Sequence, residues 1–192
     1  MFQIRIHGRG GQGVVSAAEL LSVAAFLEGR HAQAFPSFGS ERMGAPVMAF
    51  CRIDGMPIRL REPVLAPDAL IIQDATLLHQ AGLLAGVQAG GTILINSTRT
   101  LDDLGLSRLT SGTEHYRLCT VPATELAQKH VGRAVPNVPM LGALAAFTGV
   151  IALDSLISAI RQKFPRSIAE KNVAAATAAF ALASETAEVA NA

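Results

Sequence analysis

A run of four glycines in seven residues, His7-Gly8-Arg9-Gly10-Gly11-Gln12-Gly13, constrains the fold of this 192-residue chain more than any other feature. An alternating apolar stretch at 2–6 precedes the run, and an almost unbroken apolar stretch at 14–27 follows it. That order predicts a strand, a tight turn and a helix. Glycine permits positive φ and lets a ligand or another backbone come close. The first turn of a helix carries unpaired N–H groups and a positive dipole end, so this turn is suited to an anion or a carbonyl oxygen.

Gly8, Gly10 and Gly13 also fit the G-x-G-x-x-G pattern of dinucleotide-binding turns. In proteins of that kind, an Asp or Glu about 20 residues further on binds the ribose. The interval 30–39 holds no acidic residue. A dinucleotide-dependent reductase therefore stays open as a hypothesis, but one of its two defining features is missing.

The composition indicates a chain whose surface is covered by partners. Hydrophobic residues make up 50% of the chain and charged residues 16%, against a usual charged share of about 25%. Mean hydropathy is +0.36. The longest uncharged interval, 134–153, contains Pro136 and Pro139, which leave too short an apolar remainder for a membrane-spanning helix. A net charge of +1 gives no basic footprint for nucleic acid, and the N-terminus carries no secretory signal, so a cytoplasmic protein without a membrane span is expected.

The two cysteines and five histidines have no metal-binding spacing. Cys51 and Cys119 each lie in a β-like run without a neighbouring cysteine, whereas disulfide frameworks, zinc sites and iron–sulfur clusters need clustered ligands. Buried, inert thiols are expected. His7 stands at the end of the first strand, where it either satisfies the turn or takes part in a site. No metal site and no catalytic residue are expected in this chain.

Strand-like and helix-like segments alternate along the chain. The expected strands are 2–6, 31–35, 47–53, 69–74, 92–96 and 116–121, with a further strand at 56–59 after the hairpin signal Asp54-Gly55. The expected helices are 14–28, 76–88, 123–131, 138–153, 154–163 and 168–190, and 99–113 is expected to be a loop. This order predicts an α/β fold: a mostly parallel sheet with helices on both faces and a hairpin at one edge. No linker divides the chain, so residues 1–192 are expected to form one domain.

Binding residues of such sheets lie at the carboxyl ends of the strands. That rule places the glycine run, Asp74 and the segment 96–98 along one edge of the sheet. Asp74 either caps the helix that follows or contributes to a site, and the polar residues at 96–98 leave the same two alternatives.

A second informative stretch is Pro36-Ser37-Phe38-Gly39-Ser40-Glu41-Arg42-Met43-Gly44-Ala45-Pro46. Glu41 and Arg42 form either a solvated ion pair or part of a recognition surface. Two glycines and two prolines around one aromatic residue and one ion pair fix the backbone more than a simple connection needs. Rigid loops that present polar groups are frequent recognition sites.

Together, the two stretches resemble a known family. G-R-G-G-Q-G after the first strand and P-S-F-G-S-E-R-M-G-A-P-V before the third resemble the gamma subunit of 2-oxoacid:ferredoxin oxidoreductases of the pyruvate/ketoisovalerate type. Asp74, the strand ending at Asn96 and the segment Asn137-Val138-Pro139-Met140-Leu141-Gly142-Ala143 add to the match. The resemblance covers the whole chain, although Ser40 and Met43 depart from the residues common there.

The resemblance implies a Rossmann-like gamma-type domain over 1–192, without a dinucleotide. It implies a non-catalytic role in the oxidative decarboxylation of pyruvate or a related 2-oxoacid. Thiamine diphosphate, Mg and [4Fe–4S] clusters are implied in partner subunits, none of them bound by this chain alone, with coenzyme A as the co-substrate that receives the acyl group. The implied partners are alpha, beta and delta-type subunits, and electrons pass to a ferredoxin-like acceptor. Contact between subunits would account for the apolar composition.

The resemblance also implies which residues face the active-site side of the complex. They are Gly8, Arg9, Gly10, Gly11, Gln12, Gly13, Ser37, Phe38, Gly39, Glu41, Arg42, Gly44, Pro46 and Asn137. Arg9, Gln12, Glu41 and Arg42 are expected to be polar contacts, since a guanidinium is suited to a carboxylate or a phosphate. Two alternatives stay open: a free-standing dinucleotide-binding reductase, and a pure scaffold subunit whose glycine turn only packs against a partner backbone.

Overall fold

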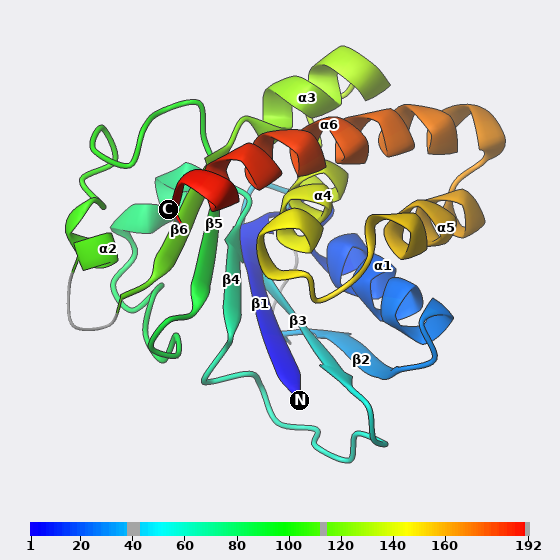
Figure 1. The fold of residues 1–192 in the computed structure, drawn as a ribbon, viewed down its shortest axis with the longest axis horizontal. Coiled ribbons are helices and arrows are strands. Elements are labelled where there is room, and N and C mark those ends of the chain that lie inside the picture. The colour runs from blue at the N-terminus through cyan, green and yellow to red at the C-terminus, as the bar shows by residue number, and fades with distance from the viewer. Residues whose placement is uncertain (38–42, 112–114, 191–192) are drawn as a thin grey trace.

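Six strands form one sheet in the computed structural model, which describes residues 1–37, 43–111 and 115–190 (Figure 1). The strands are β1 Phe2–Arg9, β2 His31–Pro36, β3 Pro46–Asp54, β4 Ala69–Ile72, β5 Thr92–Asn96 and β6 Arg117–Val121. They lie in the order β2-β3-β1-β4-β5-β6. β1, β4, β5 and β6 run parallel to one another, whereas β3 runs antiparallel to both β1 and β2. The predicted α/β fold with a mostly parallel sheet is confirmed.

The longer helices of the described residues pack on one face of this sheet (Figure 1). They are α1 Val14–Leu27, α3 Ala123–Val131, α4 Asn137–Thr148, α5 Leu153–Lys163 and α6 Arg166–Ala190. Their apolar side chains form one core with strand residues that point to the same face, such as Ile4, Ile71 and Leu94. α6 comes so close to α4 that a Cβ at Gly142 would lie 2.1 Å from the carbonyl oxygen of Ala176.

Shorter elements cover the opposite face of the sheet. The 3-10 helix η1 Ala75–His79, the short helix α2 Arg108–Ser111 and the turns between them supply apolar side chains to a second, smaller core. Leu70, Ile72 and Ile93 contribute to it from the strands. The predicted helix at 76–88 is wrong beyond residue 79. Gly82 and Gly86 adopt φ of 81° and 78°, and each positive φ interrupts a helix.

The antiparallel hairpin lies at the sheet edge, but it uses other strands than the sequence predicted. Residues 56–59 form no strand, and the hairpin consists of β2 and β3. Because β3 lies between β2 and β1, both of its edges are already hydrogen-bonded. Asp54 also ends the strand, since its Oδ1 accepts from the Met56 N–H (3.2 Å) and Pro57 has no N–H to donate.

Several other element ends differ from the prediction. The predicted helix 138–153 ends at Thr148 because Gly149 adopts φ of 64°, and α5 begins at Leu153. α6 begins at Arg166, two residues before the predicted start at 168. The predicted loop 99–113 contains α2. None of these differences moves the glycine run away from the carboxyl ends of the parallel strands.

Candidate functional site

The glycine turn, residues 8–13, joins β1 to α1 at the carboxyl edge of the sheet. Gly11 and Gly13 have φ of 96° and 72°, so both positions need a residue that tolerates the left-handed region. Gly8 needs space instead, because a Cβ there would lie 2.6 Å from the Val14 side chain. Gly13 is the N-cap of α1, and no side chain caps this helix end in the described residues. The first N–H groups of α1 have no acceptor within the helix.

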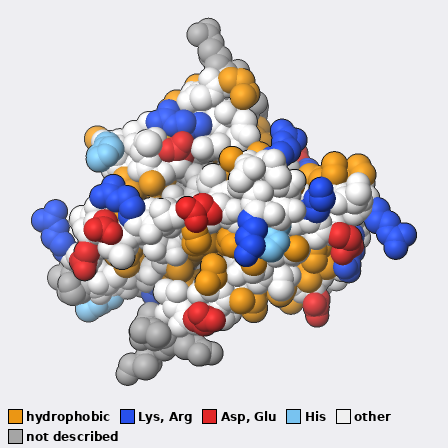
Figure 2. All heavy atoms as spheres, turned by 90° about the horizontal axis from the view of Figure 1, so that it is seen from above, with side chains coloured by type: hydrophobic (Ala, Val, Ile, Leu, Met, Phe, Trp, Pro, Cys, Tyr) orange, Lys and Arg blue, Asp and Glu red, His pale blue; other side chains and the backbone are white. Residues whose placement is uncertain are grey.

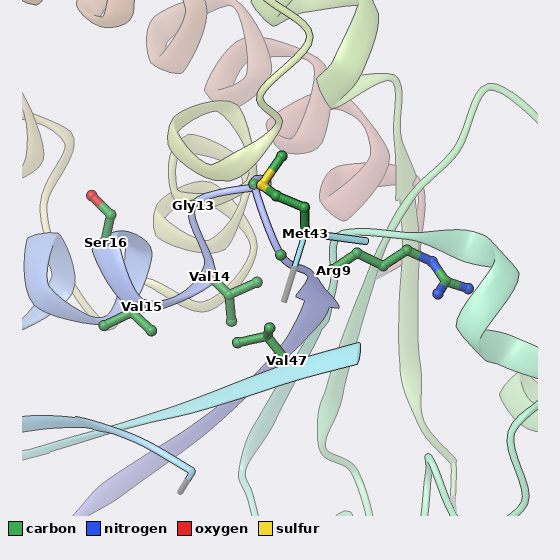
Figure 3. Close-up of a pocket in the computed structure, with 9 residues that line it drawn as sticks. Arg9, Gly13, Val14, Val15, Ser16, Met43 and Val47 are labelled. Carbon is green, nitrogen blue, oxygen red and sulfur yellow. The ribbon is translucent and has the colours of Figure 1, made fainter. Parts of the chain in front are cut away.

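A pocket of about 480 Å³ opens beside this helix end (Figure 3). It is lined by Arg9, Gly10, Gly11, Gly13, Val14, Val15, Ser16, Met43 and Val47. Val14 and Val47 point toward one another at its base, and Met43 lies across the glycine turn (Figure 3). The side chain of Met43 is 86% exposed. The pocket therefore combines an apolar floor with the positive end of a helix dipole.

The two stretches singled out in the sequence come together in their described parts. Gly10 N–H donates to the Ala45 carbonyl (2.9 Å), and Gly44 N–H donates to the Gly10 carbonyl (3.1 Å). Pro46 is the register partner of Arg9. Ser37 N–H donates to the Met48 carbonyl (2.8 Å), which extends the hairpin ladder by one residue. The remaining predicted residues of the second stretch, which are Phe38, Gly39, Glu41 and Arg42, lie outside the described residues.

Arg9 was expected to contact a ligand or a partner, but its guanidinium is bound within the chain. Nε lies 3.2 Å from Asp74 Oδ2, Nη1 donates to the Gly44 carbonyl (3.1 Å), and Nη2 donates to Thr76 Oγ1 (2.8 Å). The side chain points away from Val14, Val15 and Ser16 (Figure 3). Arg9 therefore directs its guanidinium away from these pocket residues and uses its charge to hold neighbouring segments.

Gln12, the second expected polar contact, is engaged at both ends of its amide. Oε1 accepts from the Arg9 N–H (2.8 Å), and Nε2 donates to Asp74 Oδ2 (3.0 Å). Asp74 also caps η1 through Oδ1, which accepts from Thr76 N–H (3.0 Å) and Oγ1 (2.5 Å). Burial alone would raise the pKa of the Asp74 carboxyl. The hydrogen bonds from Thr76 and Gln12 and the charge of Arg9 outweigh burial, so its pKa lies below the usual value.

A second hollow, of about 380 Å³, adjoins the pocket on the helical side. Gly11, Gly13 and Ser16 line both hollows. The second also includes Asn137, at the start of α4, whose Nδ2 donates to the Gly13 carbonyl (3.4 Å). The predicted residue Asn137 thus lies against the glycine turn, although 124 positions separate it from Gly13.

Two other residues of this edge have structural roles. Asn96 donates through Nδ2 to the Gln73 carbonyl (2.8 Å) and to Thr124 Oγ1 (2.7 Å), and its Oδ1 accepts from the Thr124 N–H (3.1 Å). It therefore ties β5 to the start of α3. His7 Nε2 is buried without a hydrogen-bond partner in the described residues. Burial, together with the charge of Arg5, lowers the pKa of His7 to about 4, so the ring is neutral near pH 7.

Thr76, Met43, Val47 and Ser16 belong to the site but were missing from the predicted set. Only Thr76 left a signal in the sequence, since it follows Asp74 at the spacing of a cap. Ser16 follows the glycine turn directly, in the first turn of α1, whereas Met43 and Val47 became site residues because a distant segment folds onto the turn.

Few groups in the described residues could hold a metal ion. No set of three or more His, Cys, Asp or Glu side chains gathers there. Burial raises the pKa of Cys51 to about 12 and that of Cys119 to about 11, so both remain thiols. None of the described helices has the length and apolar character needed to cross a bilayer.

Comparison with known proteins gives the family. A family model described as pyruvate ferredoxin/flavodoxin oxidoreductase matches residues 3–182. The pyruvate synthase subunit PorC of Methanothermobacter marburgensis is 43% identical over 180 residues, which are 94% of this chain and 96% of that one. The crystal structure of the pyruvate oxidoreductase subunit PORC from Thermotoga maritima matches with a TM-score of 0.80 at 35% identity, covering 94% of this chain and 95% of that one.

A more distant structure shares the fold. The 2-oxoglutarate:ferredoxin oxidoreductase of Magnetococcus marinus, solved with 2-oxoglutarate, coenzyme A and succinyl-CoA bound, matches with a TM-score of 0.75 at 18% identity. The match covers 96% of this chain and 31% of that one. Together the comparisons confirm the resemblance seen in the sequence and do not favour a free-standing reductase. The chain belongs to the pyruvate ferredoxin/flavodoxin oxidoreductase family, as a gamma-type subunit of an enzyme complex that oxidises a 2-oxoacid.

Proposed function

We propose that this chain forms one wall of the path by which coenzyme A reaches the active site of the complex. Residues 1–192 act as a single gamma-type domain that carries no catalytic residue. Thiamine diphosphate, Mg and the [4Fe–4S] clusters reside in alpha, beta and delta-type partner subunits, and a ferredoxin-like acceptor takes the electrons. The complex works in the cytoplasm on pyruvate or a related 2-oxoacid.

One observation carries this proposal: the uncapped start of α1 opens on the 480 Å³ pocket beside the glycine turn. Coenzyme A is a polyanion with an extended, mostly uncharged arm. Unpaired helix N–H groups and a positive dipole end favour its phosphates, and the apolar floor made by Val14 and Val47 suits the arm. The Magnetococcus marinus neighbour, whose structure holds coenzyme A, supports the same class of ligand for this fold.

The proposed partners are supported by apolar side chains that this chain leaves exposed. Phe26, near the end of α1, is 73% exposed, and Val23 and Leu27 beside it are exposed as well. On the face that Figure 2 shows, acidic and basic side chains are mixed with apolar groups. Exposed apolar side chains such as Phe26 are typical of an interface between subunits, and the mixed charges on this face lack the one-sided basic field that nucleic acid needs.

Ser16→Asp tests the role of the pocket. Ser16 lies in the first turn of α1 and lines both hollows, so a carboxylate there meets any anion that approaches. The apparent KM for coenzyme A should rise about tenfold, since repulsion between two negative charges in a partly buried site costs about 1–2 kcal/mol. The same charge favours the helix dipole, so the stability of the chain should stay the same or increase slightly.

Ser16→Asn is the matched control, because it adds the same volume without the charge. Steady-state kinetics of the assembled complex should give a KM for coenzyme A near that of the wild type for this variant. The KM for the 2-oxoacid should not change in either variant. Equal coenzyme A constants for the Asp and Asn variants would refute the proposal and favour a pure scaffold subunit.

A further inference from the structure

The Asp74 carboxylate lies within bonding distance of four donors, two from the glycine turn and two from Thr76 in η1. Oδ2 lies 3.2 Å from Arg9 Nε and 3.0 Å from Gln12 Nε2, while Oδ1 accepts from the main chain and the hydroxyl of Thr76. The carboxyl is only 17% exposed. Hydrogen bonds to an ionised group are about twice as strong as neutral ones, so this carboxylate is a strong local link.

The link continues through Arg9 and Gln12 to the rest of the site. Gln12 Oε1 accepts from the Arg9 N–H, which closes the glycine turn on itself. Arg9 Nη1 reaches the Gly44 carbonyl, and Gly44 N–H returns to Gly10. One carboxylate therefore connects the end of β1, the glycine turn, η1 and the segment that leads into β3.

A simple cap on η1 does not account for this arrangement. Capping uses Oδ1 alone, through the main chain of Thr76. The bonds to Oδ2 come from residues 62 and 65 positions earlier in the chain, and the cap on η1 does not need them. Their common target is the glycine turn, whose positive-φ backbone has several alternative conformations open to it when nothing holds it.

We propose that Asp74 is a positioning residue, which holds the glycine turn in the one conformation that keeps the uncapped start of α1 open to the pocket. Asp74 acts through Arg9 and Gln12 and touches no ligand itself. The inference rests on the proposed function of the pocket, but the order in the turn can be measured without any ligand.

Asp74→Asn in the assembled complex is the main test. An asparagine can still cap η1 through its Oδ1, but it carries no charge to attract Arg9. Its Nδ2 takes the place of Oδ2 and cannot accept the hydrogen bond from Gln12 Nε2. Amide hydrogen exchange in peptides covering 8–16 and 43–47 should accelerate about fivefold or more. The KM for coenzyme A should rise about 3- to 30-fold, as expected for the loss of charge-assisted hydrogen bonds, while kcat and the KM for the 2-oxoacid stay within twofold.

Asp68→Asn is the matched control, at the other end of the same strand. Asp68 Oδ2 accepts from the Gln3 N–H (2.7 Å), so the same substitution removes a comparable charged acceptor far from the pocket. It should leave both the exchange of the glycine turn and the KM for coenzyme A unchanged.

The double variant Gln12→Glu/Asp74→Asn provides a rescue. It exchanges donor and acceptor between the two side chains, because the new amide at position 74 can donate to a carboxylate at position 12 that also faces Arg9. Amide exchange in the glycine turn should become slow again. The KM for coenzyme A should return to within about threefold of the wild-type value. A structural defect at η1 alone would not be repaired by a change at Gln12.

The outcomes separate the two ideas. Unchanged exchange in the glycine turn of Asp74→Asn would overturn the positioning role, whatever the kinetics. Accelerated exchange with an unchanged KM for coenzyme A would leave the positioning role intact and refute the proposed use of the pocket.

Discussion

Both ends of the parallel sheet have an aspartate that accepts hydrogen bonds and a glycine with positive φ, but the two ends differ in their surroundings. At the carboxyl end, Asp74 binds side chains from several segments, and Gly13 turns the chain at φ 72°. At the amino end, Asp68 accepts from the Gln3 main chain, and Gly86 turns the chain at φ 78°. The hollow at the carboxyl end measures about 480 Å³, and the one at the amino end measures about 210 Å³.

The difference lies in which main-chain groups remain free. At the amino end the N–H groups of the connecting turns are paired: Asp68 donates to Gln3, Gln88 to Pro67 and Thr92 to Asp68. At the carboxyl end α1 begins without a side-chain cap from the described residues, and its first residues, Val14, Val15 and Ser16, line the pocket. An end of a sheet that only supports the fold pairs its main-chain polar groups within the chain. An end that binds a ligand leaves some of these groups without a partner in the chain.

Gly86→Ala should have the largest effect on stability, because it strains the scaffold end. A Cβ there would lie 2.1 Å from the carbonyl oxygen of Leu65, in a backbone conformation that L-residues avoid. The two penalties together should lower the free energy of unfolding by about 4 kcal/mol. Denaturant or thermal unfolding of the assembled complex measures this loss. The KM for coenzyme A of the complex that does assemble should be that of the wild type.

Gly90→Ala is the control for Gly86→Ala. Gly90 has a similar φ of 73°, but no atom lies within 4 Å of the position of a Cβ. Only the backbone strain remains, so the loss should be about 1–2 kcal/mol. Equal losses in the two variants would show that the contact with Leu65 is relieved by movement of the backbone.

A second, smaller effect should appear at the carboxyl end as a dependence on pH. His7 has its pKa lowered to about 4 in the folded chain, against about 6.5 in the unfolded chain. The unfolded chain therefore binds the proton more readily, so the stability is fully present above pH 6.5 and falls as the pH drops toward 4. Allowing for relaxation around the ring, the loss should reach about 2 kcal/mol.

His7→Gln removes this titration. The midpoint of thermal unfolding of the variant should change less between pH 7 and pH 4.5 than that of the wild type. If the two proteins respond equally to pH, the burial of the ring is not what makes this end sensitive to acid.

The sequence predicted those parts of the fold that depend on local pattern. The strand, turn and helix around residues 8–13 could be located from glycine spacing and apolar periodicity, and the parallel strands from their short apolar runs. The helix 76–88 could not be excluded in this way, because its apolar spacing suits a helix and only the φ values of Gly82 and Gly86 interrupt it. The pairing of β2 with β3 was missed because it is a tertiary choice between two possible neighbours for one strand.

The sequence located the main-chain segments of the candidate site, but it did not give the partners of their side chains. The glycine turn, Gly44, Pro46 and Asn137 do come together. The bonds that Arg9 and Gln12 make within the chain could not be foreseen, because their partners, Asp74 and Thr76, lie more than 60 positions away. A charged residue in a glycine-rich turn has the same appearance in the sequence whether it binds a ligand or holds the turn in place.

Gly13→Ala should lower stability less than Gly86→Ala does and should have the most specific effect on function. A Cβ at Gly13 would lie 2.4 Å from Asn137 Nδ2 and 2.8 Å from its Cγ, so the buried Asn137 side chain has to move, whereas no backbone carbonyl is in the way. The loss of stability should therefore be about 2–3 kcal/mol, above that of Gly90→Ala and below that of Gly86→Ala. The methyl group and the displaced amide both enter the region shared by the two hollows, so the KM for coenzyme A should rise several-fold. Gly13→Ala/Asn137→Ala should recover part of that affinity, because the shorter side chain removes the crowding. A Gly13→Ala complex with a wild-type KM for coenzyme A would place the ligand elsewhere and make the carboxyl end of the sheet a scaffold like the amino end.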